Sequence, residues 1–223
     1  MDSKLLIQAI TKFICGVLRV MVLIFVPAWS LSYWQGWLLM GILFIPMLIA
    51  GLIMFVISPD LLRKRLNSKE KEEEQKTVII LSIIMFILSF IVAGFNYRYN
   101  WILLPDIISY IAALIFLVGY ILYAEVLREN AFLSRTIEVQ ENQVLIDSGL
   151  YGVVRHPMYM STLILFLAMP LVLGSIISFV IMLAYIPIIA KRIRNEEEVL
   201  EKSLNGYMDY KKRIKYKLIP FIW

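Results

Sequence analysis

The chain has 223 residues, of which 61% are hydrophobic, with a formal net charge of +5 and a mean hydropathy of +0.78. Soluble domains contain roughly 45–50% apolar residues, so this composition excludes an ordinary soluble protein and predicts an integral membrane protein. A single cysteine, Cys15, excludes an intramolecular disulfide, and with one histidine as well we expect no metal site.

The N-terminal part predicts two membrane spans. No charged residue occurs from Val20 to Pro59, a run about twice the ~20 residues that one crossing needs. The chain must therefore fold back, and "PAWSLSYWQGW" (27–37) has the proline, the glycine and the aromatic belt of an interfacial turn. Lys12 and Arg19 lie early in the first span and must snorkel or belong to an interfacial helix.

Further apolar segments predict a third span at about 77–95 and a fourth at about 107–124. The last one, 157–190, is interrupted by "MPLVLGS" and predicts a helical hairpin with Pro170 and Gly174 at its tip. Each arm has about 16 residues and a length of ~24 Å, short for a ~30 Å hydrocarbon core. We expect an all-α, multi-spanning helical bundle with this hairpin at its C-terminal end.

The chain divides into two regions by these segments. Residues 1–128 hold about four N-terminal transmembrane helices, and residues 129–223 hold the hairpin and a polar C-terminal tail. With a cytosolic N-terminus, every Lys and Arg except Arg98 falls on or near the inner side, as the positive-inside rule requires. We expect a multi-pass protein, of a prokaryotic plasma membrane, with both termini cytosolic. The basic residues then face lipid headgroups, and nucleic acid is not an expected partner.

Unusual polar residues gather around the only histidine, in "GLYGVVRHPMY" (149–159). Pro157 suits the first turn of a helix, which makes His156 the expected N-cap. The helix N-terminus and Arg155 would together favour an anion there. The simpler alternative is that Arg155 meets lipid phosphate and His156 only caps the helix.

A second polar cluster, "RIRNEEEVL" (192–200), follows the hairpin. Arg192 and Glu196 are four residues apart and share a helix face, whereas Glu197 points about 100° away. Spacing alone favours an ordinary exposed ion pair. Tyr207 and Tyr210, further on, are interpreted as interfacial anchors.

The combination of "SGLYGVVRHPMY", an apolar hairpin, "RIRNEEEVL" and "GYMDYKKRI" closely resembles the isoprenylcysteine carboxyl methyltransferase family and its phospholipid methyltransferase relatives. The resemblance covers about the last 95 residues. It implies a cytosolic pocket for S-adenosylmethionine that is not a Rossmann fold, and the sequence has no GxGxxG after a strand. Its eukaryotic members often have His where this chain has Gln143, and a longer connecting loop.

The resemblance also implies which residues form the site. The cofactor would be held by Gln140, Gln143, Val144, Leu145, Ile146, Tyr151, His156, Pro157, Met158, Tyr159 and Glu196. Arg192 would contact the substrate and, with Glu197 supporting it or the tail, would form the catalytic pair.

The implied reaction is transfer of a methyl group to a lipophilic acceptor, leaving S-adenosylhomocysteine. A carboxylate acceptor, such as that of an isoprenylated cysteine, is ionised at neutral pH and needs no general base, whereas an amine must first lose a proton. A chain with one histidine therefore favours O-methylation. N-methylation of a phospholipid or small-lipid amine, and a noncatalytic transporter or scaffold, remain the alternatives.

Overall fold

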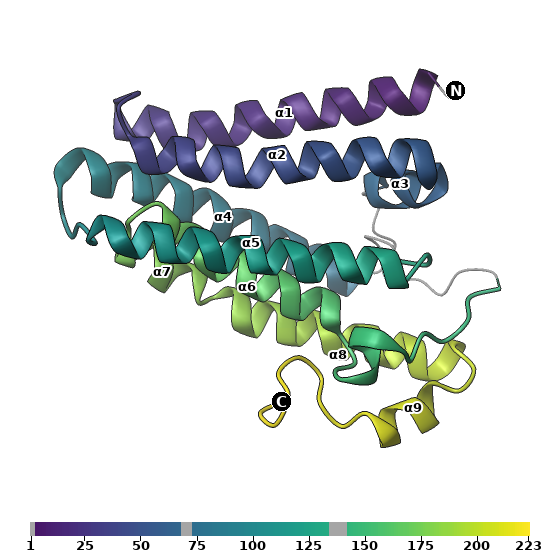
Figure 1. Ribbon diagram of the computed structural model, residues 1–223. Helices are drawn as coiled ribbons and strands as arrows, with labels where there is room; N and C mark the ends of the chain where they lie inside the picture. Colours follow the sequence, from purple (N-terminus) through teal and green to yellow (C-terminus); the bar gives the residue numbers. More distant parts are fainter. Residues whose placement is uncertain (1–2, 68–72, 134–141) are drawn as a thin grey trace.

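The computed structural model describes residues 3–67, 73–133 and 142–223, and the regular structure in these ranges is helical (Figure 1). One isolated bridge, between Leu103 and Ser175, is the only β pairing there. The elements in chain order are α1 (Ser3–Ala28), α2 (Trp34–Ile57), α3 (Pro59–Leu66), α4 (Glu73–Tyr99), α5 (Asp106–Glu129), the 3₁₀ turn η1 (Gly149–Gly152), α6 (Pro157–Val172), α7 (Ile176–Met182), α8 (Tyr185–Ser203) and α9 (Tyr207–Arg213).

Five segments of the described chain are long and apolar enough to cross a membrane. They are Ser3–Ala28, Trp34–Ile57, Gln75–Tyr99, Asp106–Glu129 and Ile176–Ser203. The sixth apolar helix, α6, has 16 residues and is shorter than a full crossing usually needs. The expected all-α, multi-spanning membrane fold is confirmed.

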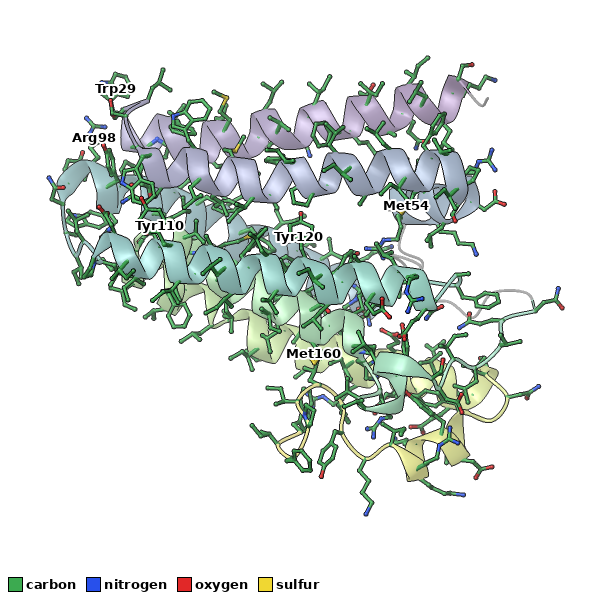
Figure 2. All side chains as sticks on the ribbon, in the orientation of Figure 1. Trp29, Met54, Arg98, Tyr110, Tyr120 and Met160 are labelled. Carbon is green, nitrogen blue, oxygen red and sulfur yellow. The ribbon has the colours of Figure 1, made fainter. Side chains whose placement is uncertain are left out.

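The predicted reversal after the first span is confirmed. α1 ends at Ala28 and α2 begins at Trp34, within "PAWSLSYWQGW". Trp29 takes a left-handed backbone conformation in this turn. The Arg98 guanidinium lies 5.5 Å from the Trp29 ring centre, and both residues are at one end of the bundle (Figure 2). Arg98 is thus far from the basic segments at the opposite end.

The C-terminal hairpin differs from its predicted limits of 157–190. Its tip is where expected, since Gly174 follows α6 and has the positive φ of a tight turn. The second arm is broken between α7 and α8 at Leu183 and Ala184, and then continues to Ser203, well past Ala190. α8 as a whole is amphipathic. Ile189 and Ile193 are buried on one side of the helix, and most of its charged residues lie on the other.

Small residues let the spanning helices pack closely. A Cβ at Gly94 of α4 would lie 2.6 Å from the Ile24 carbonyl oxygen and 2.9 Å from the Ala28 nitrogen, so α1 and α4 are in backbone contact. Deeper in the bundle, the hydroxyls of Ser89 and Ser178 are 2.6 Å apart and join α4 to α7. Small side chains and buried hydroxyl pairs are typical of helix packing in lipid.

The C-terminal end of α5, the turn η1, the beginning of α6, the second half of α8 and α9 come together at one end of the bundle (Figure 1). The α1–α2 turn lies at the other end. The two polar clusters of the sequence are therefore neighbours in space, although the hairpin separates them along the chain.

Candidate active site

A pocket lies where these elements meet. It is walled by the end of α5 and the segment after it, by the irregular backbone at 143–146, by the start of α6, by α8 and by α9. Its lining residues are Asn130, Phe132, Leu133, Gln143, Val144, Leu145, Ile146, Tyr151, Arg155, His156, Pro157, Met158, Tyr159, Arg192, Glu196, Val199, Leu200, Leu204, Tyr207 and Tyr210.

The pocket brings together most of the residues that the resemblance implies for the site. Gln143 to Ile146, Tyr151, His156 to Tyr159, Arg192 and Glu196 all line it. Gln140 falls in 134–141, outside the described residues. Glu197 differs from the rest, because it is 4% exposed and lies within the wall of the pocket rather than on its surface.

α6 begins at the pocket as its sequence predicts. Pro157 occupies the first turn, where its missing N–H costs nothing, and His156 is the N-cap residue. The imidazole is buried, and its Nε2 lies 3.2 Å from Oε1 of Glu197. Its ring is stacked near that of Tyr159, with centres 5.8 Å apart. His156 is therefore held on one side by a carboxylate and on the other by an aromatic ring.

Arg155 does not serve as the free cation expected there. It is 6% exposed, and its Nε donates to Oε1 of Glu197 at 2.8 Å. Its Nη1 donates to the carbonyl oxygens of Ile214 and Lys215 at 2.7 and 2.9 Å. Burial also rules out the alternative that Arg155 meets lipid phosphate. Its charge is neutralised by Glu197, and its Nη1 binds the C-terminal tail.

The tail runs beside the start of α6. The backbone N–H groups of Arg155 and His156 donate to the carbonyl oxygens of Tyr216 and Lys217, each at 2.9 Å. Glu197 also accepts from the tail, since Nζ of Lys217 lies 3.2 Å from its Oε2. The contacts of Glu197 thus tie α6 and α8 to the tail, one of the two supporting roles expected of it.

A hydrogen-bonded chain crosses the pocket wall between α6 and α8. Nε of Arg192 donates to the Tyr159 hydroxyl at 2.9 Å, and that hydroxyl donates to the carboxylate of Glu196. Tyr159, the middle member, is 4% exposed, whereas Arg192 and Glu196 are half-buried. Nη1 of Arg192 also lies 3.5 Å from Oε1 of Gln75, on α4. The pair predicted from i,i+4 spacing is thus bridged by a buried tyrosine from another helix.

Tyr207 and Tyr210 are not the interfacial anchors that their sequence context predicts. Each is 3% exposed, and both line the pocket. The Tyr210 hydroxyl donates to the carbonyl oxygen of Tyr151 at 2.8 Å, which holds α9 against η1. Local sequence gave no signal for this because the partners are about sixty positions away.

Tyr151 is fixed from α5 as well. Nδ2 of Asn130 donates to its hydroxyl at 2.8 Å, and burial raises the pKa of Tyr151 to about 12. The phenol therefore stays neutral at physiological pH. Glu129 supports the same turn by accepting from the Leu150 N–H at 3.1 Å. Asn130 and Glu129 are site-supporting residues that sequence reasoning missed.

The pocket combines a carboxylate, aromatic rings and irregular backbone. Glu196 offers a partner for a cation, and the rings of Tyr151 and Tyr159 offer faces for a flat or cationic group. The backbone at 143–146 lies outside helix and strand and lines the pocket. In the described ranges no three His, Cys, Asp or Glu residues cluster in a way that would hold a metal ion.

Comparisons with known proteins found a family, a relative and a solved structure that are similar to this chain. Residues 107–205 match the model of the phospholipid methyltransferase family. A stretch of 91 residues is 32% identical to a Delta(14)-sterol reductase of Mus musculus, and this stretch covers 40% of the chain and 22% of the mouse protein. The matched part thus spans about a fifth of that relative.

A solved structure is similar in outline. It is the eukaryotic intramembrane Ras methyltransferase, isoprenylcysteine carboxyl methyltransferase, with a TM-score of 0.49 and 17% identity over 96% of this chain and 84% of that one. The family match covers α5 to α8, the elements that carry both polar clusters. The resemblance expected from those clusters is thereby confirmed, and residues 107–205 carry the sequence pattern of the phospholipid methyltransferase family.

Proposed function

We propose that the chain is an S-adenosylmethionine-dependent methyltransferase of the membrane that methylates a carboxylate of a lipophilic acceptor, such as an isoprenylated cysteine. The observation that carries the proposal is the convergence of residues 143–159 with Arg192 and Glu196 around one pocket. The match of residues 107–205 to a methyltransferase family supports it.

The pocket residues fit the chemical groups of this cofactor. The Glu196 carboxylate suits the α-ammonium, while the rings of Tyr151 and Tyr159 suit the adenine or the sulfonium. The backbone from Gln143 to Ile146, which lines the pocket outside helix and strand, suits the polar edge of a purine. When bound, the cofactor supplies an electrophilic methyl group.

Arg192 is placed to orient the acceptor. Its Nε is fixed by Tyr159, and a guanidinium can bind a carboxylate through two parallel hydrogen bonds. The acceptor oxygen forms the new bond to the methyl carbon as the methyl–sulfur bond breaks, which gives an ester and a thioether with no proton to remove. Positioning supplies much of the rate acceleration in such a transfer.

The location suits both substrates. The pocket lies at one end of a bundle of spanning helices, where a lipid-linked acceptor can arrive laterally and a charged cofactor from water. We assign this end to the cytosolic face because the basic segments gather there and Arg98 lies opposite. A prokaryotic plasma membrane, with cytosolic termini, remains part of the proposal.

N-methylation of a phospholipid or small-lipid amine is the second candidate, favoured by the description of the matching family. An ammonium must lose a proton before it can attack, so this reaction needs a base. The single histidine is already bound to Glu197, which leaves Glu196 as the carboxylate lining the pocket among the described residues. This arrangement favours the carboxylate acceptor.

Methyl-labelled S-adenosylmethionine distinguishes the two reactions. Purified protein in detergent or nanodiscs is incubated with it and either a farnesylcysteine analogue or phosphatidylethanolamine. We expect label in the farnesylcysteine product that is released as methanol by mild base, because esters hydrolyse there. Base-stable label in the phospholipid would instead establish N-methylation.

Part of the chain is similar to a sterol reductase, so ligand binding is also tested with the cofactor of a reductase. Thermal unfolding is measured with S-adenosylhomocysteine and, separately, with NADPH, because a reductase requires a hydride donor. We expect stabilisation by S-adenosylhomocysteine alone. Stabilisation by NADPH alone would point to reduction and reject the methyltransferase proposal.

A further inference from the structure

Tyr207 presents an unsatisfied donor to the pocket. Its side chain is 3% exposed and lines the cavity, yet among the described residues its hydroxyl has no hydrogen-bond partner. Buried hydroxyls are nearly always bonded, so an orphan one in a pocket indicates a ligand atom as its partner. Tyr210, on the same helix, shows the contrast because its hydroxyl donates to Tyr151.

The hydroxyl is available as a donor. Burial, and then the carboxylates of Glu197 and Glu196, raise the pKa of Tyr207, so the phenol keeps its proton at physiological pH. The neutral phenol can therefore donate a hydrogen bond to an acceptor atom of a ligand. S-adenosylmethionine offers such atoms in its α-carboxylate, its ribose and its adenine.

Two other polar side chains in the pocket wall, Arg155 and His156, already make hydrogen bonds within the protein. The Arg155 guanidinium binds Glu197 and the carbonyl oxygens of Ile214 and Lys215. Nε2 of His156 faces Glu197 at 3.2 Å. These nitrogens of Arg155 and His156 are thus engaged within the protein, whereas the Tyr207 hydroxyl has no partner among the described residues.

We propose that the Tyr207 hydroxyl donates a hydrogen bond to the α-carboxylate of the bound cofactor. The ammonium and the carboxylate of the cofactor are attached to one carbon, so an ammonium held by Glu196 brings the carboxylate close to the groups beside Glu196. Tyr207 is a candidate for such a group, because Glu196 and Tyr207 line the same pocket. This assignment rests on the proposed function and adds a specific contact at its amino-acid end.

The test compares S-adenosylhomocysteine with 5′-methylthioadenosine, which lacks the amino-acid end. Dissociation constants are measured for wild type and Tyr207→Phe in the same detergent. We expect Tyr207→Phe to bind S-adenosylhomocysteine about tenfold more weakly or worse, since a hydrogen bond to a charged group is lost. Binding of 5′-methylthioadenosine should change less than about twofold.

Melting of the ligand-free protein provides the control. Tyr207→Phe should melt at the wild-type temperature or above, because the removed hydroxyl has no partner in the part of the chain that the structure describes. Tyr210→Phe should melt lower, because it removes the bond to Tyr151. A fall for Tyr207→Phe equal to that of Tyr210→Phe would reveal a protein partner and overturn the assignment.

The remaining outcomes separate the two proposals. Unchanged affinity of Tyr207→Phe for S-adenosylhomocysteine overturns the Tyr207 assignment and leaves the proposed function standing. Equal weakening for both ligands places the contact on the nucleoside and also overturns it. Failure of wild type to bind S-adenosylhomocysteine rejects the proposed function itself.

Discussion

Arg155 and Glu197 form an ion pair inside the protein, with Nε and Oε1 2.8 Å apart and side chains only 4% and 5% exposed. The pair joins Arg155, which precedes the N-cap residue of α6, to Glu197 in α8. Lys217 adds a third element, since its Nζ is 3.2 Å from the same carboxylate. The Glu197 carboxylate thus joins the start of α6, α8 and the C-terminal tail in the wall of the pocket.

Replacing this carboxylate should be costly. We expect Glu197→Gln to lower stability by about 3 kcal/mol or more, because removing one partner leaves a buried, uncompensated arginine. Apparent melting temperature in detergent measures the effect. Glu198→Gln, at the exposed neighbouring position, is the control and should melt like wild type. Equal melting of the two variants would show that the pair carries little stability.

Glu196 and Arg192 should separate binding from turnover. We expect Glu196→Ala to abolish binding of S-adenosylhomocysteine, because the proposed partner of its ammonium is gone. Arg192→Ala should retain binding and lose turnover by a factor of about 100 or more, consistent with the loss of a charged, two-point substrate contact. Calorimetry and the methyl-transfer assay measure these effects, and equal cofactor affinity in wild type and Glu196→Ala would reject the assignment.

Arg192→Lys refines the same prediction. Lysine keeps the positive charge but has no planar fork and no Nε at the position that Tyr159 binds. We expect turnover well below wild type with cofactor affinity unchanged. Full activity of Arg192→Lys would mean that only charge matters at this position.

Gly149 is a backbone requirement of the turn that carries Tyr151. Its φ is +54°, and a Cβ there would overlap the Glu129 carboxylate that accepts from Leu150. Gly149→Ala should destabilise the protein by about 1 kcal/mol or more and weaken cofactor binding. Gly152→Ala is the matched control, since its Cβ would meet only the Asp147 carbonyl oxygen at 3.4 Å. Comparable melting and affinity in both variants would contradict this role.

Gly94 should be required for α1 to pack on α4. Any Cβ there would press on the Ile24 carbonyl and the Ala28 nitrogen, which are backbone atoms and cannot rotate away. We expect Gly94→Ala to lower the melting temperature, with a cost of about 1–3 kcal/mol from overpacking. Gly41→Ala adds a methyl group where nothing lies within 4 Å and should be neutral. A neutral Gly94→Ala would show that the two helices separate freely.

Features with a local physical cause could be predicted from the sequence. The long uncharged run required a reversal, and the chain reverses between Ala28 and Trp34. Pro157 required a helix start, and α6 begins there. The gathering of residues 143–159 with Glu196 followed from a family resemblance, since spacing alone favoured an ordinary ion pair.

Features that depend on distant partners could not be predicted. Tyr207 and Tyr210 have the context of interfacial aromatics, but pairing of the tail with Arg155 and His156 brings this region against the pocket. Arg155 had the context of a lipid-facing cation until Glu197, forty-two positions on, neutralised it. The extension of α8 to Ser203 likewise depends on its apolar face packing against the bundle.

The central claim is that residues 143–159 and Glu196 enclose one molecule of S-adenosylmethionine. A structure of the protein with S-adenosylhomocysteine tests it most directly. We predict ligand density in the pocket between the start of α6 and α8, with the amino-acid end beside Glu196 and Tyr207 and the purine beside residues 143–146. Ligand density at the Arg98 end of the bundle, or outside the pocket on the same end, would contradict the account.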